Sequence, residues 1–194
     1  MPDTAPDGGI LDLLRRRASC KQCRLNGAPT LEQAAALLST LRIRQGATRP
    51  YPSGGSRYPV ETYLVGGVAD YARDIFHYDP AAHALEHIAT AREDFEIATL
   101  FHPPLGYAGI APTVLIFSSV WKRIACKYGD FGYVLALLEA GHMAQNILLM
   151  AAALDLGARP MAGFTDDVVN ELLQIDGVDE QALYAVALSS AAPV

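Results

Sequence analysis

The chain has few charged residues, few cysteines and no excess of positive charge. Charged residues make up 19% of the 194 residues and hydrophobic residues 51%. This balance is too apolar for a disordered chain and is sufficient for the core of one domain. The formal net charge of −6 gives no basic footprint for nucleic acid. We therefore expect a disordered terminus over residues 1–8, a single domain over residues 9–194 and no nucleic-acid partner.

The three cysteines are an odd number and do not make a disulfide framework. Cys20 and Cys23 have the spacing of a redox or metal pair, but no second pair or histidine cluster completes a zinc site. We therefore expect no metal. The first residues also lack the apolar core of a signal peptide, and we expect a reducing, cytoplasmic location.

Residues 130–156 contain no proline, and Gly157 stands where a helix C-cap belongs. This stretch predicts one helix of about 27 residues, roughly 40 Å long. Its second half is apolar on nearly every side, which requires burial all round. Gln145, Asn146 and Asp155 make it a poor membrane span. Because a domain of this size cannot easily surround such a helix alone, we expect a homodimer with a site near the shared core.

The remaining elements follow from periodicity and turn signals. Thr30 and Gln33 form a capping box at the start of a helix over 31–41, and further helices are expected over 9–17, 91–100 and 166–174. Strands are expected over 60–65, 74–78, 84–88, 113–119, 158–163 and 182–188. This order predicts an α+β fold in which a mixed sheet carries helices on both faces.

Several motifs carry a family resemblance. Residues 138–149 read LEAGHMAQNILL, residues 156–164 read LGARPMAGF, residues 127–130 read KYGD and residues 49–63 read RPYPSGGSRYPVETY. With RASCK at 17–21, these motifs resemble those of SagB/ThcOx-type dehydrogenases, a branch of the FMN-dependent nitroreductase superfamily. The resemblance implies a nitroreductase-like FMN-binding fold, with a mixed, mainly antiparallel sheet flanked by helices, in an intertwined homodimer.

The resemblance also implies a phosphate site after the first helix. Arg17, Ser19 and Lys21 alternate there, a spacing that suits a guanidinium, a hydroxyl and an ammonium converging on the phosphate of FMN. The alternative is ordinary surface charge.

Other cofactor contacts are implied at three places. The Pro-Ser-Gly-Gly segment lets backbone approach a planar ligand and in the superfamily reaches the flavin of the partner subunit, although such a segment alone is more often a turn. Backbone after the strand that follows the long helix meets flavin N5. The amides of the long helix either contact flavin or make a structural hydrogen bond. The residues concerned are Pro52, Ser53, Gly54, Ser56, Ala162, Gly163, Gln145 and Asn146.

Lys127 and Tyr128 are the expected catalytic pair. An ammonium beside a phenol favours the phenolate, which places a proton acceptor beside a hydride acceptor. The resemblance implies that this pair serves the oxidation of thiazoline or oxazoline rings. The alternative is a surface lysine beside a packing tyrosine. His142 is either a core histidine or a second catalytic candidate.

These features predict an FMN-dependent dehydrogenase. Its expected substrate is an azoline ring or amino-acyl group on a peptide or carrier-bound natural-product intermediate, with oxygen as the final acceptor. We also expect biosynthetic partner enzymes and no membrane partner. Two alternatives stay open: an NAD(P)H-dependent nitro or quinone reductase, and a non-catalytic flavin-binding subunit of a modification complex.

Overall fold

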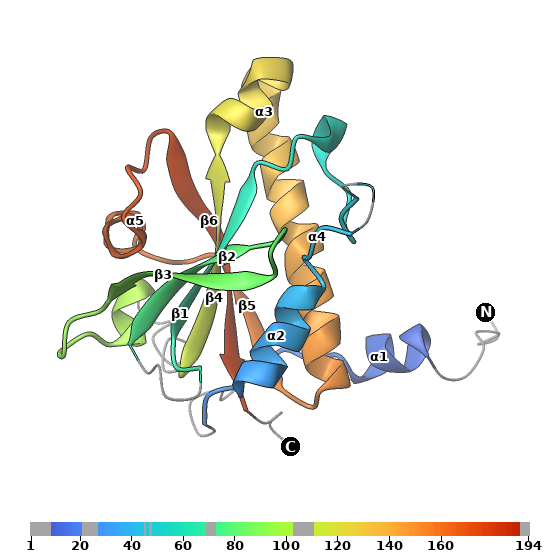
Figure 1. The fold of residues 1–194 in the computed structure, drawn as a ribbon, viewed down its shortest axis with the longest axis vertical. Coiled ribbons are helices and arrows are strands. Elements are labelled where there is room, and N and C mark those ends of the chain that lie inside the picture. The colour runs from blue at the N-terminus through green and yellow to red at the C-terminus, as the bar shows by residue number, and fades with distance from the viewer. Residues whose placement is uncertain are drawn as a thin grey trace.

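A six-stranded sheet forms the centre of the molecule (Figure 1). The computed structural model describes residues 9–20, 27–44, 46, 48–68, 73–102 and 111–190. The strand order is β3-β2-β1-β4-β6-β5, and the pairs between these strands are all antiparallel. The strands are β1 (Val60–Gly66), β2 (Asp74–Asp79), β3 (Ala84–Thr90), β4 (Thr113–Val120), β5 (Gly157–Met161) and β6 (Glu180–Ser189).

Helices cover both faces of this sheet, as Figure 1 shows. One hydrophobic cluster joins α2 and α4 to one face, and a second joins α5 to the other. This architecture confirms the predicted fold class, a nitroreductase-like sheet flanked by helices. The helices are α1 (Ile10–Arg16), α2 (Leu31–Ser39), α3 (Trp121–Tyr128), α4 (Gly132–Ala153) and α5 (Asp166–Leu173), with single turns η3 (Gly54–Ser56), η4 (Ile97–Leu100) and η6 (Gly129–Phe131).

The start of α2 confirms the predicted capping box. The Thr30 hydroxyl accepts a hydrogen bond from the Gln33 amide at 3.2 Å, and the Gln33 side chain accepts one from the Thr30 amide at 2.9 Å. Two of the unpaired amides at the helix start are thereby satisfied.

Two helix predictions were wrong. The helix expected over 91–100 is reduced to η4, because the Ala91 amide still bonds to Arg73 at the end of the β2–β3 hairpin. Phe95 and Ile97 nevertheless pack on the sheet. In addition, α3 was not predicted. It begins directly after β4 and is separated from α4 by Gly129, whose φ of 53° favours glycine.

The long helix is shorter than predicted. It has 22 residues and ends at Ala153, because Asp155 adopts a φ of 53° and Gly157 already begins β5. Exposed apolar side chains lie on its N-terminal half, not on the second half: Phe131 is 59% exposed and Leu138 54%. By length and mean hydropathy, residues Phe131–Ala153 could cross a membrane. One side of α4 is buried in the core, and we interpret it as a core helix.

Candidate functional site

Most of the predicted site residues that the structure describes lie in two groups at opposite ends of α4 (Figure 1). At the N-terminal end, a Cβ placed on Gly54 would lie 2.9 Å from the side chain of Leu135. At the C-terminal end, Ser19 lines a cavity of about 150 Å³ together with Ala152 and Leu156. Ala152 lies 17 positions after Leu135 along the helix, which corresponds to roughly 25 Å. The two groups are therefore distant within one chain.

The first group brings the glycine loop onto the predicted catalytic pair. Lys127 and Tyr128 end α3, with the Lys127 ammonium 5.3 Å from the centre of the Tyr128 ring. A Cβ placed on Gly55 would lie 2.6 Å from the Tyr128 hydroxyl and 2.7 Å from Lys127 Nζ. Gly55 also has a φ of 59°, which side chains rarely adopt. Glycine is therefore what allows this loop to reach the pair.

Hydrogen bonds fix α3 against the loop. Arg57 Nε donates to the Arg123 carbonyl at 2.8 Å, and its guanidinium also donates to Cys126 Sγ at 2.9 Å. Arg123 forms an ion pair with Glu61 on β1. These contacts set the position of the helix that carries Lys127 and Tyr128.

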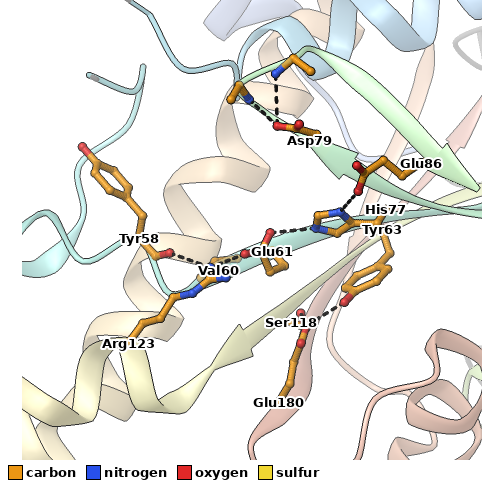
Figure 2. A network of polar contacts seen from close by, with 12 residues as sticks. Tyr58, Val60, Glu61, Tyr63, His77, Asp79, Glu86, Ser118, Arg123 and Glu180 are labelled. Atoms are coloured by element: carbon orange, nitrogen blue, oxygen red, sulfur yellow. Dashed lines mark hydrogen bonds and ion pairs between the residues drawn. The ribbon is translucent and has the colours of Figure 1, made fainter. Parts of the chain in front are cut away.

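Glu61 belongs to a charged network that sequence reasoning missed (Figure 2). His77 lies between two carboxylates, 2.9 Å from Glu61 and 3.1 Å from Glu86. The hydrogen bond to Glu61 outweighs burial and raises the pKa of His77 to about 9, so the ring is charged at neutral pH. Burial would raise the pKa of Glu61, but hydrogen bonds from His77 and Arg123 outweigh it and hold that pKa below its usual range. The network thus anchors α3 to the sheet through charge.

A second missed residue, Glu139, lies inside the core beneath the loop. Its side chain is on α4 and only 1% exposed. One carboxyl oxygen accepts from the Val60 amide at 3.4 Å. Burial raises the pKa of Glu139 from 4.5 to about 7, although the Ser53 side chain, the Val60 hydrogen bond and the charge of Arg49 oppose the shift. The sequence feature that could have revealed this residue is a glutamate within an otherwise apolar helix.

The raised pKa of Glu139 has a consequence for stability. A carboxyl whose pKa is higher in the folded than in the unfolded state loses its proton first in the unfolded state, so stability falls as pH rises between those values. With the two values at 4.5 and about 7, we expect Glu139→Gln to gain about 3 kcal/mol relative to the native protein between pH 5 and pH 8. Urea unfolding at both pH values measures this difference. The exposed Glu171→Gln should show no such gain, and a pH-independent effect of Glu139→Gln would contradict the assignment.

The amides of α4 differ from one another. Asn146 Nδ2 donates to the Pro50 carbonyl at 3.1 Å and to the Thr40 carbonyl at 3.5 Å, which matches the structural alternative for this residue. Gln145 is exposed. His142 is exposed as well, so it is not a core histidine within the single chain.

The second group surrounds the start of β5. Arg17 follows α1 and is half-buried, while Ser19 is exposed and lines its cavity with Gly157 and Ala158. The segment is fixed by a hydrogen bond of 2.9 Å from the Cys20 amide to the Ala158 carbonyl. Lys21 lies outside the described residues. Cys20 forms a disulfide bond, which the odd number of cysteines did not predict.

Ala162 and Gly163 follow β5 at the edge of the sheet. The Gly163 carbonyl accepts a hydrogen bond from the His102 amide at 3.1 Å, and the adjacent Phe164 bridges to Phe101. Ala162 is exposed. Its side chain carries no polar group, so only a backbone contact with a ligand fits this position.

The chemistry of these groups fits FMN. The guanidinium of Arg17 and the hydroxyl of Ser19, beside a cavity, are donors that suit an anionic phosphate. The Gly55 segment, which has no room for a Cβ towards Tyr128, offers bare backbone to a flat ring. The donors of Arg17 and Ser19 would therefore suit the phosphate of FMN, and the bare backbone at Gly55 would suit its ring.

Known proteins match this chain over most of its length. A sequence model described as the nitroreductase family matches residues 14–189. A Methanocaldococcus jannaschii protein named as a nitroreductase is 34% identical over 125 residues, 64% of this chain and 63% of the relative. The Escherichia coli microcin B17-processing protein McbC is 32% identical over 133 residues, 66% of this chain and 49% of the relative. The chain thus spans about half to two thirds of these curated relatives.

A solved structure has the same fold. A chain of the E. coli microcin synthetase McbBCD complex with truncated pro-MccB17 bound aligns with a TM-score of 0.79 and 25% sequence identity. The alignment covers 100% of this chain and 76% of that one.

Proposed function

The chain belongs to the nitroreductase family, and we propose that it is an FMN-dependent dehydrogenase of the SagB type that the motifs predicted. Its substrate is an azoline ring or amino-acyl group on a peptide or carrier-bound natural-product intermediate. The observation that carries this proposal is the close approach of the Gly55 backbone to the Tyr128 hydroxyl and the Lys127 ammonium, which leaves no room for a Cβ. That contact places an acid–base pair beside the loop predicted to reach flavin. The microcin-processing relative supports a peptide substrate and partner enzymes.

In the proposed reaction, an azoline ring loses one proton and one hydride and becomes aromatic. Tyr128, as the phenolate, takes the proton, and the positive charge of Lys127 stabilises the phenolate. When bound, FMN would serve as the hydride acceptor, and oxygen would finally take the electron pair together with two protons and leave as hydrogen peroxide. Arg57 and Arg123, which fix α3 to the loop, keep the base at a constant place relative to the substrate.

The same proposal includes a homodimer in a cytoplasmic setting. Arg17 and Tyr128 lie at opposite ends of α4, so one chain cannot bring both to one FMN. Two chains related by a twofold axis can, because each site then takes Arg17 from one chain and Tyr128 from the other. The exposed apolar side chains on the N-terminal half of α4, among them Phe131 and Tyr133, support burial against a second copy.

The test starts from the purified protein. We expect it to be yellow, to elute as a dimer and to release FMN on denaturation. A thiazoline-containing model peptide should be oxidised with matching oxygen uptake. A stable flavin-free monomer would contradict the proposal. Consumption of NADH with a quinone acceptor, without oxidation of the peptide, would instead favour a reductase.

A further inference from the structure

We propose that Glu139 is a positioning residue that clamps the segment from Ser53 to Val60 onto α4 and thereby holds Gly55 against Lys127 and Tyr128. The proposal rests on the proposed function for its catalytic meaning, because Lys127 and Tyr128 are the base only if that function holds. The clamp itself is a structural property that can be measured without flavin or substrate.

The contacts of Glu139 reach both ends of the loop. Its carboxyl accepts from the Val60 amide at 3.4 Å at the far end of the loop, and the Ser53 side chain at the near end lowers the pKa of the same carboxyl. Ser53 Oγ accepts from the Tyr58 amide at 2.8 Å. One buried carboxyl therefore lies beneath the loop, bonded to its far end and close to the Ser53 hydroxyl at its near end.

The loop needs such a clamp because its backbone is strained. Gly55, Ser56 and Tyr58 have φ values of 59°, 55° and 47°. Residues other than glycine persist in this region only where the surrounding structure holds them. The strained residues lie between Ser53, which is close to the Glu139 carboxyl, and Val60, which is bonded to it. Loss of the clamp would let them relax and move Gly55 away from the pair.

A second polar residue on the same side of α4 holds the start of the segment. Asn146 is seven residues after Glu139, about two helical turns, and donates to the Pro50 carbonyl. Its amide does not titrate, whereas the carboxyl of Glu139 does. The loop is thus held by one hydrogen bond that does not depend on pH, from Asn146, and by one that does, to Glu139.

The charges around Glu139 make the clamp sensitive to pH. Arg49 favours the ionised carboxyl, whereas burial and Glu61 disfavour it. The neighbouring Tyr51 hydroxyl accepts from Arg49 at 2.8 Å, which occupies part of the guanidinium. The other carboxyl oxygen, Oε2, is buried without a hydrogen-bond partner among the described residues. An ionised carboxylate in this place is costly, so a rise in pH through neutrality favours loop opening.

Amide hydrogen exchange of the purified protein, followed by NMR, tests the clamp. In Glu139→Ala, protection of the Tyr58 and Val60 amides should fall at least tenfold at pH 6 relative to β4 amides of the same sample. Glu139→Gln keeps a carbonyl acceptor and should retain protection at pH 6 and pH 8, while the native protein loses it between these values. Glu171→Gln on α5 should behave like the native protein. Unchanged protection in Glu139→Ala, an equal loss in β4, or loss of protection in Glu139→Gln would overturn the proposal.

A second readout connects the clamp to catalysis. With the thiazoline peptide, Glu139→Ala should lower kcat more than it raises KM, and Glu139→Gln should restore kcat and flatten its pH dependence above pH 7. A normal kcat in Glu139→Ala would overturn the catalytic role. If the exchange results hold and no variant, including the native protein, oxidises the peptide, the proposed function fails and the clamp stands.

Discussion

Replacement of Tyr128 by phenylalanine is expected to lower substrate oxidation by roughly 10²–10⁴-fold, the usual contribution of a positioned acid–base group. The change removes only the hydroxyl that lies beside Gly55. Folding and flavin binding should therefore be unaffected. The rate of peptide-dependent flavin reduction in a stopped-flow experiment without oxygen measures this step directly.

Two controls separate a lost base from a lost cofactor. Reduction of the bound flavin by dithionite needs no protein base and should be the same in Tyr128→Phe and in the native protein. Lys127→Ala should retain flavin and shift the pH–rate profile upward, because the phenolate loses its neighbouring positive charge. Near-native oxidation in both single variants would remove the pair from catalysis, and His142, which is exposed, would become the next candidate.

Local signals predicted much of the fold. Periodicity, β-branched residues and turn signals predicted the six strands of the described sheet to within a few residues, and Thr30 with Gln33 predicted the start of α2. The short helix α3 was missed because its N-cap residue is Val120, which makes no side-chain hydrogen bond. The sequence therefore lacks the Ser, Thr, Asp or Asn that usually marks a helix start. The end of α4 was predicted too late in the sequence. Gly157 is the first residue of β5 and not a helix cap, and the chain turns at Asp155, because aspartate tolerates a positive φ.

The site was predictable only where it depends on sequence-local motifs. The Pro-Ser-Gly-Gly segment and the Lys127–Tyr128 pair were proposed from short stretches. Gly55 was not singled out, because its approach to the pair joins residues more than seventy positions apart. Glu139 and His77 were missed for the same reason, since their partners come from other elements. Sequence spacing also could not show that Arg17 lies at the far end of α4 from Tyr128. That separation results from the length of α4, because α1 lies at one end of this helix and α3 at the other.

Because Arg17 and Tyr128 lie at opposite ends of α4, we expect two inactive variants to regain activity when they pair in one mixed dimer. Arg17→Ala removes a charge-assisted hydrogen bond and should weaken FMN by roughly one to two orders of magnitude. Without added FMN, this variant should be nearly inactive, as should Tyr128→Phe. When each site takes Arg17 from one chain and Tyr128 from the other, a heterodimer of the two variants carries one site with both changes and one site with neither.

Co-expression of the two variants should therefore restore about a quarter of native activity, because random pairing gives half heterodimers and each has one intact site of two. The measurement is peptide oxidation by the mixed preparation after removal of free FMN. Mixing of the two purified variants without subunit exchange is the matched control and should give no recovery. If each chain instead built its own site, every site in the mixed dimer would carry one of the two changes, and activity would stay at the level of the single variants. Recovery thus distinguishes a site shared between two chains from a site within one.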